Sequence, residues 1–513
     1  MPEPDPLTSP NTGAIAHASA DAPLNPVPAN GMRTFLQILV NTAVANLTTS
    51  YLWFALTFWV YLETRSVLAT GIIGGAYMLL VAIFGMVFGT IVDRRRKHQA
   101  MVIASTTSLG AFVVVGIIFE AVGQAQILNL GGPWFWLFCG IILFGGVIEN
   151  MRNIALSTTV TLLVPPDRHA NANGLVGTVT GVAFIVTSVF SGLSVGVLGM
   201  GWTLLIAIVV TALVLAHLLT LRIPEARPHV EQSAPIVDVR GALGAIRLVP
   251  GLFALIIFST FNNLIGGVYM ALMDPYGIDM FGVEGWGILF GVAATGFVVG
   301  GLIIAKFGLG KNPIRTLLLI VALMGILGAA FTIREWWPLY AIGIWVYMAM
   351  IPAVEAAEQT VIQRVVPFTT QGRVFGFAQA FEAAAAPITA FLIAPIAEFF
   401  IIPLMDSREG QEQWGWLVGE GQSRGIALVF VFAGLIMTVV ALLAFLTPSY
   451  RRISAQYATS PDALESAADS SDSDTPEDHT EAHTEADTAP APHRDAVGQP
   501  SAVTSSNAGS VES

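Results

Sequence analysis

The feature that most constrains this chain is a succession of apolar runs, each long enough to cross a lipid bilayer. A spanning helix needs about 20 residues, since each residue advances the helix by about 1.5 Å. Between the polar ends of the chain such runs follow one another with only short polar connections. They predict membrane-spanning helices at 34–61, 66–92, 99–121, 133–163, 172–198, 200–221, 250–273, 285–307, 314–333, 336–364, 374–402 and 424–447. We therefore expect an all-α integral membrane protein with twelve transmembrane helices.

The composition excludes a soluble protein. Hydrophobic residues make up 54% of the 513 residues and charged residues only 11%, whereas soluble proteins carry about 25% charged residues. The net charge of −12 comes almost entirely from residues 453–513, which hold twelve acidic residues and one arginine. Because the rest of the chain is close to neutral, its charge gives no reason to expect nucleic acid as a partner.

Changes in composition divide the chain into five parts. Residues 1–32 are rich in Pro, Ala, Asn and Ser without apolar periodicity, so a disordered N-terminal arm is expected. Residues 448–513 are expected to be an acidic, disordered C-terminal tail. The longest polar connection between spans is 222–249, which contains three prolines. It is predicted to be a cytoplasmic linker between an N-terminal six-helix bundle at 33–221 and a C-terminal one at 250–447.

Basic residues are distributed unevenly between the connections. If the N-terminus is inside, the inner connections and ends carry seventeen Lys and Arg and the outer ones four. This agrees with the excess of positive charge on the cytoplasmic side of membrane proteins, and a miscounted span would scramble the alternation. We therefore predict a multi-pass protein of the cell membrane (plasma or inner membrane) with both termini in the cytoplasm.

A short internal repeat relates the two halves. Val164-Pro165 followed by Gly174 matches Val366-Pro367 followed by Gly376 at one constant offset. Each copy closes a long helix, the fourth or the tenth, and opens the next. A duplicated six-helix unit is typical of secondary transporters, so two pseudo-symmetric six-helix bundles are expected.

The most specific local signal lies between the second and third spans. It resembles the Gly-x-x-x-Asp-Arg-x-Gly-Arg-Arg loop of the major facilitator superfamily, with Arg96 where the family usually has Gly. Glycine lets two helices approach closely, and an acidic group at a helix end can face the positive N-terminus of another helix. The resemblance implies a conformational latch made of Gly89, Asp93, Arg94, Arg95, Arg96 and Lys97. The alternative is a basic cytoplasmic loop with an incidental Asp.

Two further segments narrow the resemblance. Leu163–Arg168 leading into Ala172–Gly174 resembles the "lvP…R.ANG" connection of the macrolide-efflux and enterobactin-exporter branch. Gln363–Pro367 leading into Gln371–Val374 resembles that branch's "Q..vP…GRv.g" segment. The resemblance covers roughly residues 33–447 and implies the major facilitator fold and a drug:proton antiporter. The Gly-Pro pair that family antiporters often carry in the fifth helix is absent, which leaves the direction of transport open.

Ionisable side chains inside the spans are the best functional candidates, because a charge at the bilayer centre costs at least about 2.5–3.5 kcal/mol. Glu149 and Arg152 share one face of the fourth span, and Glu355 and Glu358 share one face of the tenth. Glu382 lies at a comparable depth in the eleventh. Such a group can couple proton binding to a conformational change. The alternatives are a static ion pair in the fourth span, a water-filled inner vestibule at the tenth and a structural role in the eleventh.

Uncharged polar residues in the first and seventh spans predict a substrate path. Asn side chains facing lipid would be costly, so they should point inward, and in the family the first, fourth, seventh and tenth helices line the central cavity. The candidates are Asn41, Asn46, Thr49, Asn262 and Asn263.

These observations together predict a transporter. The sequence has no Gly-x-x-x-x-Gly-Lys-[Ser/Thr] phosphate loop, zincin motif or Gly-x-Ser-x-Gly elbow, so no cofactor, metal or enzymatic activity is expected. We predict a monomeric, proton-coupled secondary transporter that exports hydrophobic drugs or a secreted metabolite such as a siderophore by alternating access. The alternatives are an importer or lipid transporter of the same superfamily and a transport-inactive membrane scaffold or sensor.

Deletion of residues 453–513 separates a transporter from a scaffold that recruits partners through its acidic tail. A transporter should keep most of its efflux, because the deletion removes none of the predicted spans. The measurement is efflux of a lipophilic dye from cells that hold equal amounts of full-length and shortened protein in the membrane. Absence of efflux with the full-length protein, together with a cellular effect that the deletion removes, would favour the scaffold.

Overall fold

The structure is a computed structural model that describes residues 28, 30–225, 238–419 and 423–459. All secondary structure within these residues is helical. Eleven helical stretches among them are long and apolar enough to cross a membrane. Helix α1 (Gly31–Thr64) is less apolar because Asn and Thr side chains interrupt it, but its 34 residues are more than a bilayer requires. It forms the twelfth span.

Six spans make up the N-terminal half. Its helices after α1 are α2 (Val67–Arg94), α3 (Lys97–Val122), α4 (Gln124–Ile127), α5 (Pro133–Ile148), α6 (Asn150–Leu163), η1 (Pro166–Arg168) and α7 (His169–Thr220). Helices α5 and α6 form one span that is interrupted at Glu149. Helix α7 contains two spans, which meet at Gly199 in the left-handed region at φ 80°, where only glycine fits without strain. The sequence places the boundary between its fifth and sixth spans at the same residue.

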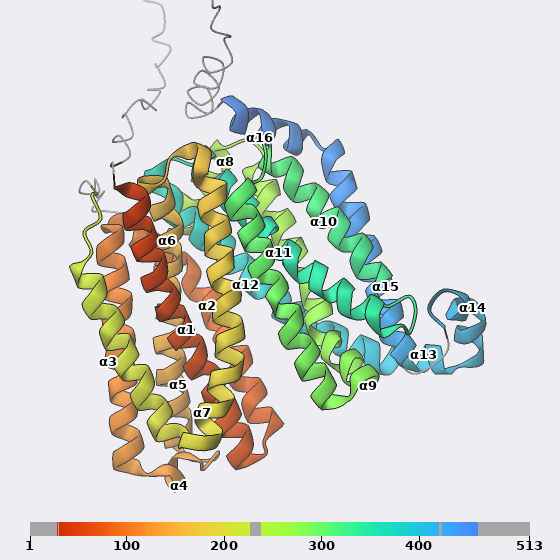
Figure 1. The fold of residues 1–513 in the computed structure, drawn as a ribbon, viewed down its shortest axis with the longest axis horizontal. Helices are drawn as coiled ribbons and strands as arrows, with labels where there is room; N and C mark the ends of the chain where they lie inside the picture. Colours follow the sequence, from red (N-terminus) through yellow and green to blue (C-terminus); the bar gives the residue numbers. More distant parts are fainter. Residues whose placement is uncertain (1–27, 29, 226–237, 420–422, 460–513) are drawn as a thin grey trace, which may run out of the picture. The chain divides into compact units, whose positions relative to one another are not determined.

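The C-terminal half follows the same plan. Its helices are α9 (Leu252–Phe307), α10 (Pro313–Ala330), α11 (Trp337–Val365), η2 (Phe368–Thr370), α12 (Gln371–Ile396), η3 (Ala397–Ile401), α13 (Ile402–Asp406), α14 (Arg408–Val418) and α15 (Ser423–Leu446). Helix α9 contains two spans that meet at Gly282, with φ 70°. The two halves stand side by side, and α13 and α14 project from the far end of the C-terminal half (Figure 1).

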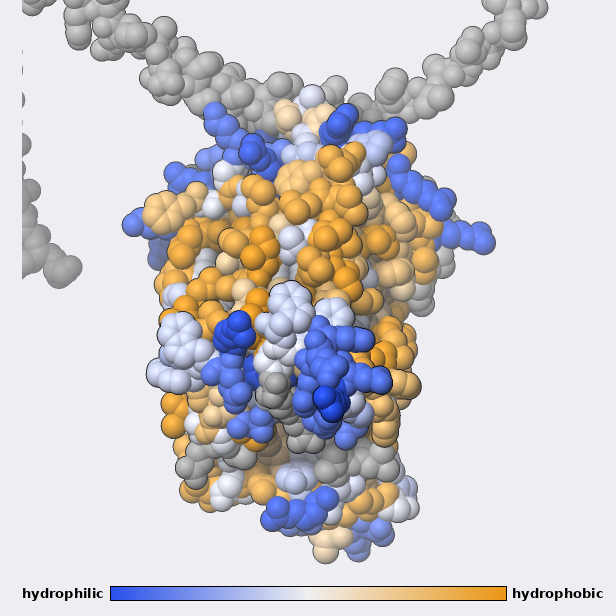
Figure 2. All heavy atoms as spheres, turned by 90° about the vertical axis from the view of Figure 1, so that its right-hand side faces the viewer, coloured by the Kyte–Doolittle hydropathy of each residue, from blue (hydrophilic) through white to orange (hydrophobic). Residues whose placement is uncertain are grey.

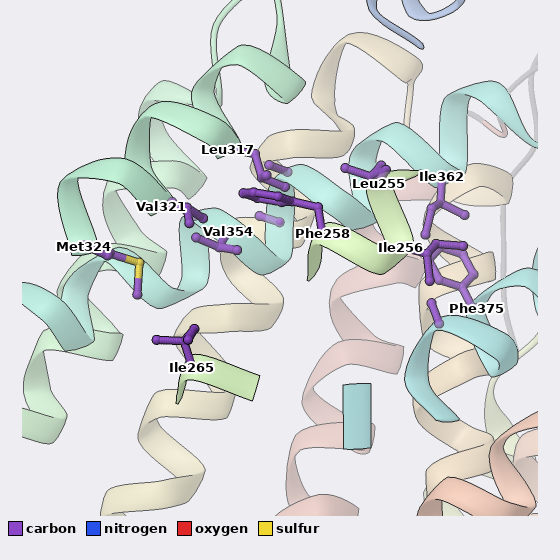
Figure 3. Close-up of a cluster of buried hydrophobic side chains, with 14 of the residues drawn as sticks. Leu255, Ile256, Phe258, Ile265, Leu317, Val321, Met324, Val354, Ile362 and Phe375 are labelled. Carbon is purple, nitrogen blue, oxygen red and sulfur yellow. The ribbon is translucent and has the colours of Figure 1, made fainter. Parts of the chain in front are cut away.

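Apolar packing holds each half together, and an apolar surface surrounds it. In the C-terminal half, Phe258 of α9 and Val354 of α11 point toward Leu317 and Val321 of α10 (Figure 3). On the outer surface of this half, hydrophilic side chains gather at one end and around the projecting segment, and the band between them is apolar (Figure 2). This is the surface expected of a protein that is solvated by lipid.

Two further helices lie at one end of the bundle, α8 (Val239–Leu248) and α16 (Pro448–Thr459) (Figure 1). We call it the inner end, because the connections predicted to be cytoplasmic gather there. The prediction that the chain is disordered from residue 448 is wrong for α16. Ile453 and Tyr457 are buried one turn apart, and the Tyr457 hydroxyl accepts a hydrogen bond of 3.1 Å from Arg364 of α11. The sequence did not indicate this helix because only two apolar anchors interrupt its polar sequence. The tail deletion proposed above should therefore begin at residue 460, so that α16 is kept intact.

The predicted tail beyond residue 459 and the predicted N-terminal arm through residue 27 lie outside the described residues.

Glycines bring the two halves into close contact at the inner end. A Cβ atom on Gly89 of α2 would lie 2.4 Å from the backbone oxygen of Gly372, and one on Gly376 would lie 2.4 Å from the backbone oxygen of Gly85. The halves meet at two boundaries, α2 with α12 and α7 with α9. The second is equally tight, since a Cβ on Gly174 of α7 would lie 2.4 Å from the backbone nitrogen of Ala305 in α9. Gly174 and Gly376 are the two equivalent glycines of the internal repeat, so each copy of the repeat supplies one close contact between the halves.

The same helix faces separate at the other end. Gly71, Gly74 and Met78 lie on the face of α2 that carries Gly85 and Gly89, because their spacing follows the helical period. A Cβ atom on Gly71 or Gly74 would nevertheless meet nothing within 4 Å. Helix α2 therefore packs on α12 along its inner half and diverges from it along its outer half. The structure is therefore closed at the inner end on both boundaries and open at the outer end between α2 and α12.

A pair of Gly→Ala substitutions tests this description. Gly89→Ala should lower the melting temperature, because the new methyl group meets backbone atoms of α12. Gly74→Ala is the matched control on the same helix face; it should leave the melting temperature unchanged or raise it, since alanine favours the helix by about 1 kcal/mol over glycine. Thermal unfolding of the purified protein in detergent measures both, and equal destabilisation by the two substitutions would contradict the packing.

Candidate transport site

A buried ion pair links four helices of the N-terminal half. Glu149 lies at the break between α5 and α6, and the guanidinium of Arg152 donates to its carboxylate. Arg152 is completely buried; it also donates to Asn41 of α1 over 2.7 Å and to Ser105 of α3. The second Glu149 oxygen accepts a hydrogen bond of 3.2 Å from Ser108. Both charges therefore have partners, as burial in a low-dielectric interior requires.

The other three candidate carboxylates lie together in the C-terminal half. Glu358 of α11 and Glu382 of α12 lie within hydrogen-bonding distance of each other, and Glu355 is close enough for its charge to act on both. Glu358 is buried and Glu382 half-buried, while the Glu355 side chain has accessible surface. One oxygen of Glu358 and one of Glu382 have no hydrogen-bond partner. Two carboxyl groups at this distance repel when both are charged and can share a proton instead.

A cavity of about 820 Å³ lies beside this acidic cluster at the boundary between the halves. Its walls come from α1, α2, α9 and α12. The lining residues are Trp53, Gly74, Gly75, Met78, Asn263, Met270, Gln379, Glu382, Ala383, Ala386, Pro387, Phe391 and Pro395. Its volume is within the range of small-molecule sites, which are mostly apolar with a few polar groups.

Of the five predicted substrate-path residues, only Asn263 lines the cavity, and the other four have other surroundings. The neighbouring Asn262 has a buried oxygen without a partner. Asn41 holds Arg152, and Asn46 donates to Asn153 of α6 over 2.7 Å. The Thr49 hydroxyl bonds to the backbone of its own helix. A role in substrate binding stays a prediction for all five, and the cavity geometry favours Asn263.

One residue that the sequence did not single out connects the two groups of charges. Gln379 of α12 lines the cavity and donates a hydrogen bond of 3.4 Å to Asn150, the residue after Glu149. Gln379 lies one helical turn before Glu382, so it connects the helix that carries one of the acidic residues with the helix that carries Arg152. The sequence did not indicate this role of Gln379, because its partner lies 229 positions away in the chain.

Asp93 crosses from α2 to the N-terminus of α12 at the inner end. Its carboxylate accepts hydrogen bonds from the backbone nitrogens of Gly372 (2.7 Å) and Arg373 (2.9 Å) and from the Arg373 side chain (3.0 Å). These are free N–H groups of the first helical turn, where the helix dipole also favours a negative charge. The Arg373 guanidinium also bonds to Asp238, the N-cap of α8, over 2.7 Å. This three-residue contact fastens both halves and the linker together.

The rest of the predicted latch supports the same closure. Lys97 is buried; its ammonium group lies 3.7 Å from Glu225 of the linker and 4.7 Å from the ring centre of Phe368 in the C-terminal half. Burial raises the pKa of the Glu225 carboxyl, and the charge of Lys97 acts in the opposite direction. Arg96 has φ −59°, which any residue adopts, so its turn does not need the glycine found elsewhere. Arg94 and Arg95 complete the same loop.

A neutral contact closes the second boundary. Asn173 of α7 and Gln363 of α11 exchange hydrogen bonds of 2.9 and 3.2 Å, and Gln363 also donates to the backbone oxygen of Ser157. Both amides are buried. They belong to the two motifs that the sequence analysis compared with the exporter branch, and their mutual contact could not be read from either motif alone.

Comparison with known proteins agrees with this arrangement. The sequence model of the Major Facilitator Superfamily matches residues 38–390. The chain belongs to the Major Facilitator Superfamily. It is therefore a transporter and a multi-pass membrane protein, as members of this superfamily are.

Among curated proteins, macrolide efflux protein A of Streptococcus pyogenes is 25% identical over 379 residues, which cover 71% of this chain and 89% of that protein. The protein of the same name from Enterococcus faecalis is 25% identical over 322 residues, covering 60% and 94%. These matches place the chain in the macrolide-efflux branch predicted from its motifs.

Solved structures show the same fold. A bacterial homologue of the iron transporter ferroportin in an outward-facing state superposes with a TM-score of 0.57 at 14% identity, covering 81% of this chain and all of that one. The human organic anion transporter MFSD10 gives 0.57 at 14% identity, covering 80% and 98%. At this identity the likeness extends to the fold alone.

Removal of one partner tests the buried ion pair. Arg152→Met should leave the Glu149 charge buried without a cation and destabilise the protein by about 3–5 kcal/mol. The double variant Glu149→Gln with Arg152→Met removes both charges and should unfold at a higher temperature than the single variant. Thermal unfolding in detergent gives both values. A single variant as stable as the unchanged protein would show that the pair does not hold the helices together.

Proposed function

We propose that this transporter exports hydrophobic small molecules from the cytoplasm across the cell membrane by exchange for protons. The observation that carries the proposal is the cluster of Glu355, Glu358 and Glu382 beside the cavity between the two halves. No ion pair involving these three carboxylates is found among the residues that the structure describes. A carboxyl cluster without a cation takes up protons more readily than an ion pair does.

The arrangement supports a cycle in which protonation and cargo compete. In the outward-open state Glu382 lines the cavity, so protons from outside can reach the cluster. A protonated cluster no longer attracts a polar or cationic cargo group, which favours cargo release. The neutral form is also less costly to enclose in an apolar interior, which favours closure of the outer end. Deprotonation toward the cytoplasm then restores the attraction for cargo.

The closed inner end keeps the cavity from opening to both sides of the membrane at once. Asp93, the Asn173–Gln363 contact and the packed glycines hold the inner end shut while the cavity is open outward. When the halves rock, these contacts separate and the diverging faces of α2 and α12 come together. The macrolide efflux proteins that are 25% identical to this chain support export, and the excess of basic residues at the inner end supports cytoplasmic termini.

Substitution of a carboxylate by its neutral isostere tests proton coupling. Glu358→Gln should abolish transport driven by a proton gradient while cargo exchange at equal pH continues, because the cavity keeps its shape. Glu398→Gln is the matched control, since Glu398 is exposed in η3 away from the cavity lining. The measurement is uptake of a lipophilic dye and of a labelled macrolide into inside-out vesicles, with and without a protonophore. Gradient-driven transport at full rate in the Glu358 variant, or transport that the protonophore does not change, would contradict the proposal.

A further inference from the structure

The cavity between α2 and α12 opens along helix faces rather than only at their ends. On α12, Ala383, Pro387 and Phe391 continue the face on which Gly376 packs against α2, because they follow at helical spacing. On α2 the continuing face is formed by Met78 and the glycines before it. Where these faces diverge, the gap lies between two neighbouring helices at the outer boundary of the protein. In a membrane, the material beside such a gap is the outer leaflet.

The rim of the gap is apolar. Phe391 is 80% exposed and Met270 65% exposed, although both line the cavity. Glu382 is the only charged residue among the lining residues described above, and it lies at the deep end, toward Gln379 and Asn150. A mouth that opens to water would expose these large apolar side chains at a cost of about 25 cal/mol for each Å² of apolar surface. Contact with lipid chains removes that cost.

The deep end of the cavity contains polar groups without partners. The indole nitrogen of Trp53 and one oxygen each of Gln379 and Glu382 are buried and unpaired. The amide nitrogen of Gln379 already donates to Asn150, so its oxygen is free to accept. Two of these three groups are acceptors, and one of them is a carboxylate. A ligand that fits them carries a hydrogen-bond-donating head, such as an amine, on an apolar body.

We propose that this cavity is a binding site that exchanges its ligand with the outer leaflet through the gap between α2 and α12. The ligand is an amphiphile whose donating head reaches Gln379 and Glu382 while its apolar body lies against Met78, Met270 and Phe391. The proposal rests on the proposed function in that the bound amphiphile is the cargo. The gap is then the exit by which an apolar molecule leaves without crossing water.

Spin labels test the lipid contact without requiring transport. Cys139 is the only cysteine, so a Cys139→Ser background allows a single label at Phe391→Cys. Leu392→Cys is the lipid-facing control, 57% exposed on a different face of α12, and Arg408→Cys on α14 is the water-exposed control. In nanodiscs, oxygen should relax the label at 391 as strongly as the label at 392, and a water-soluble nickel chelate should have little effect. Relaxation like that at 408 would show an aqueous mouth and overturn the proposal.

A photoreactive alkylamine dissolved in the liposome membrane tests the ligand. It should cross-link to peptides of α2 and α12, and Glu382→Gln should reduce that yield severalfold while Glu398→Gln leaves it unchanged. Cross-linking that is insensitive to Glu382→Gln, or that maps to other helices, would overturn the assignment of the site. If both tests succeed but dye transport is independent of the proton gradient, the coupling proposal fails and the lipid-facing site stands. If transport is coupled to the proton gradient but the label at 391 is in water, the lipid-facing site fails and the coupling proposal stands.

Discussion

The contact between the Asp93 carboxylate and the first turn of α12 is the interaction on which the rest of the structure depends. A buried carboxylate needs compensation, and three hydrogen bonds from one helix N-terminus and one guanidinium provide it. Hydrogen bonds to charged groups contribute about 1.5–3 kcal/mol each. The contact forms only when α2 and α12 are close enough for Gly89 to touch Gly372. In the proposed cycle this contact is therefore present while the inner end is closed and absent while it is open, as a two-state mechanism requires.

The two boundaries between the halves use different chemistry for the same purpose. The boundary of α2 with α12 is held by charges that include the linker residue Asp238, whereas the boundary of α7 with α9 and α11 is held by the neutral amides Asn173 and Gln363. In both, glycines permit backbone contact. The two groups of acidic side chains also differ. Glu149 is paired with the Arg152 guanidinium inside one half, whereas the three glutamates of the other half have only each other nearby, and one of them, Glu382, lines the cavity. We therefore propose a structural role for the ion pair and a transport role for the glutamates of the C-terminal half.

Much of this architecture could be predicted from the sequence. Apolar run length predicted the spans and placed one boundary at Gly199, where the structure has a positive φ that glycine adopts without strain. The sequence also indicated that an acidic residue at position 93 would suit a helix N-terminus, but it could not identify the helix, since Arg373 lies 280 residues away. For the same reason the sequence could pair Glu149 with Arg152, which follows three residues later in the same helix, but it could not pair Glu382 with Glu358 of a different helix. Helix α16 was missed because only two apolar residues anchor it.

The central claim is that the Asp93 contact holds the inner end closed and thereby the outer end open. Its most direct measurement is the distance between spin labels at Ile72→Cys on α2 and Leu392→Cys on α12, both exposed on the outer halves of their helices, in the Cys139→Ser background. Asp93→Asn removes the charge without changing the shape of the side chain. Pulsed electron paramagnetic resonance should then show the distance distribution shifting to shorter values as outward-open molecules are lost. A distribution identical to that of the parent protein would contradict the account.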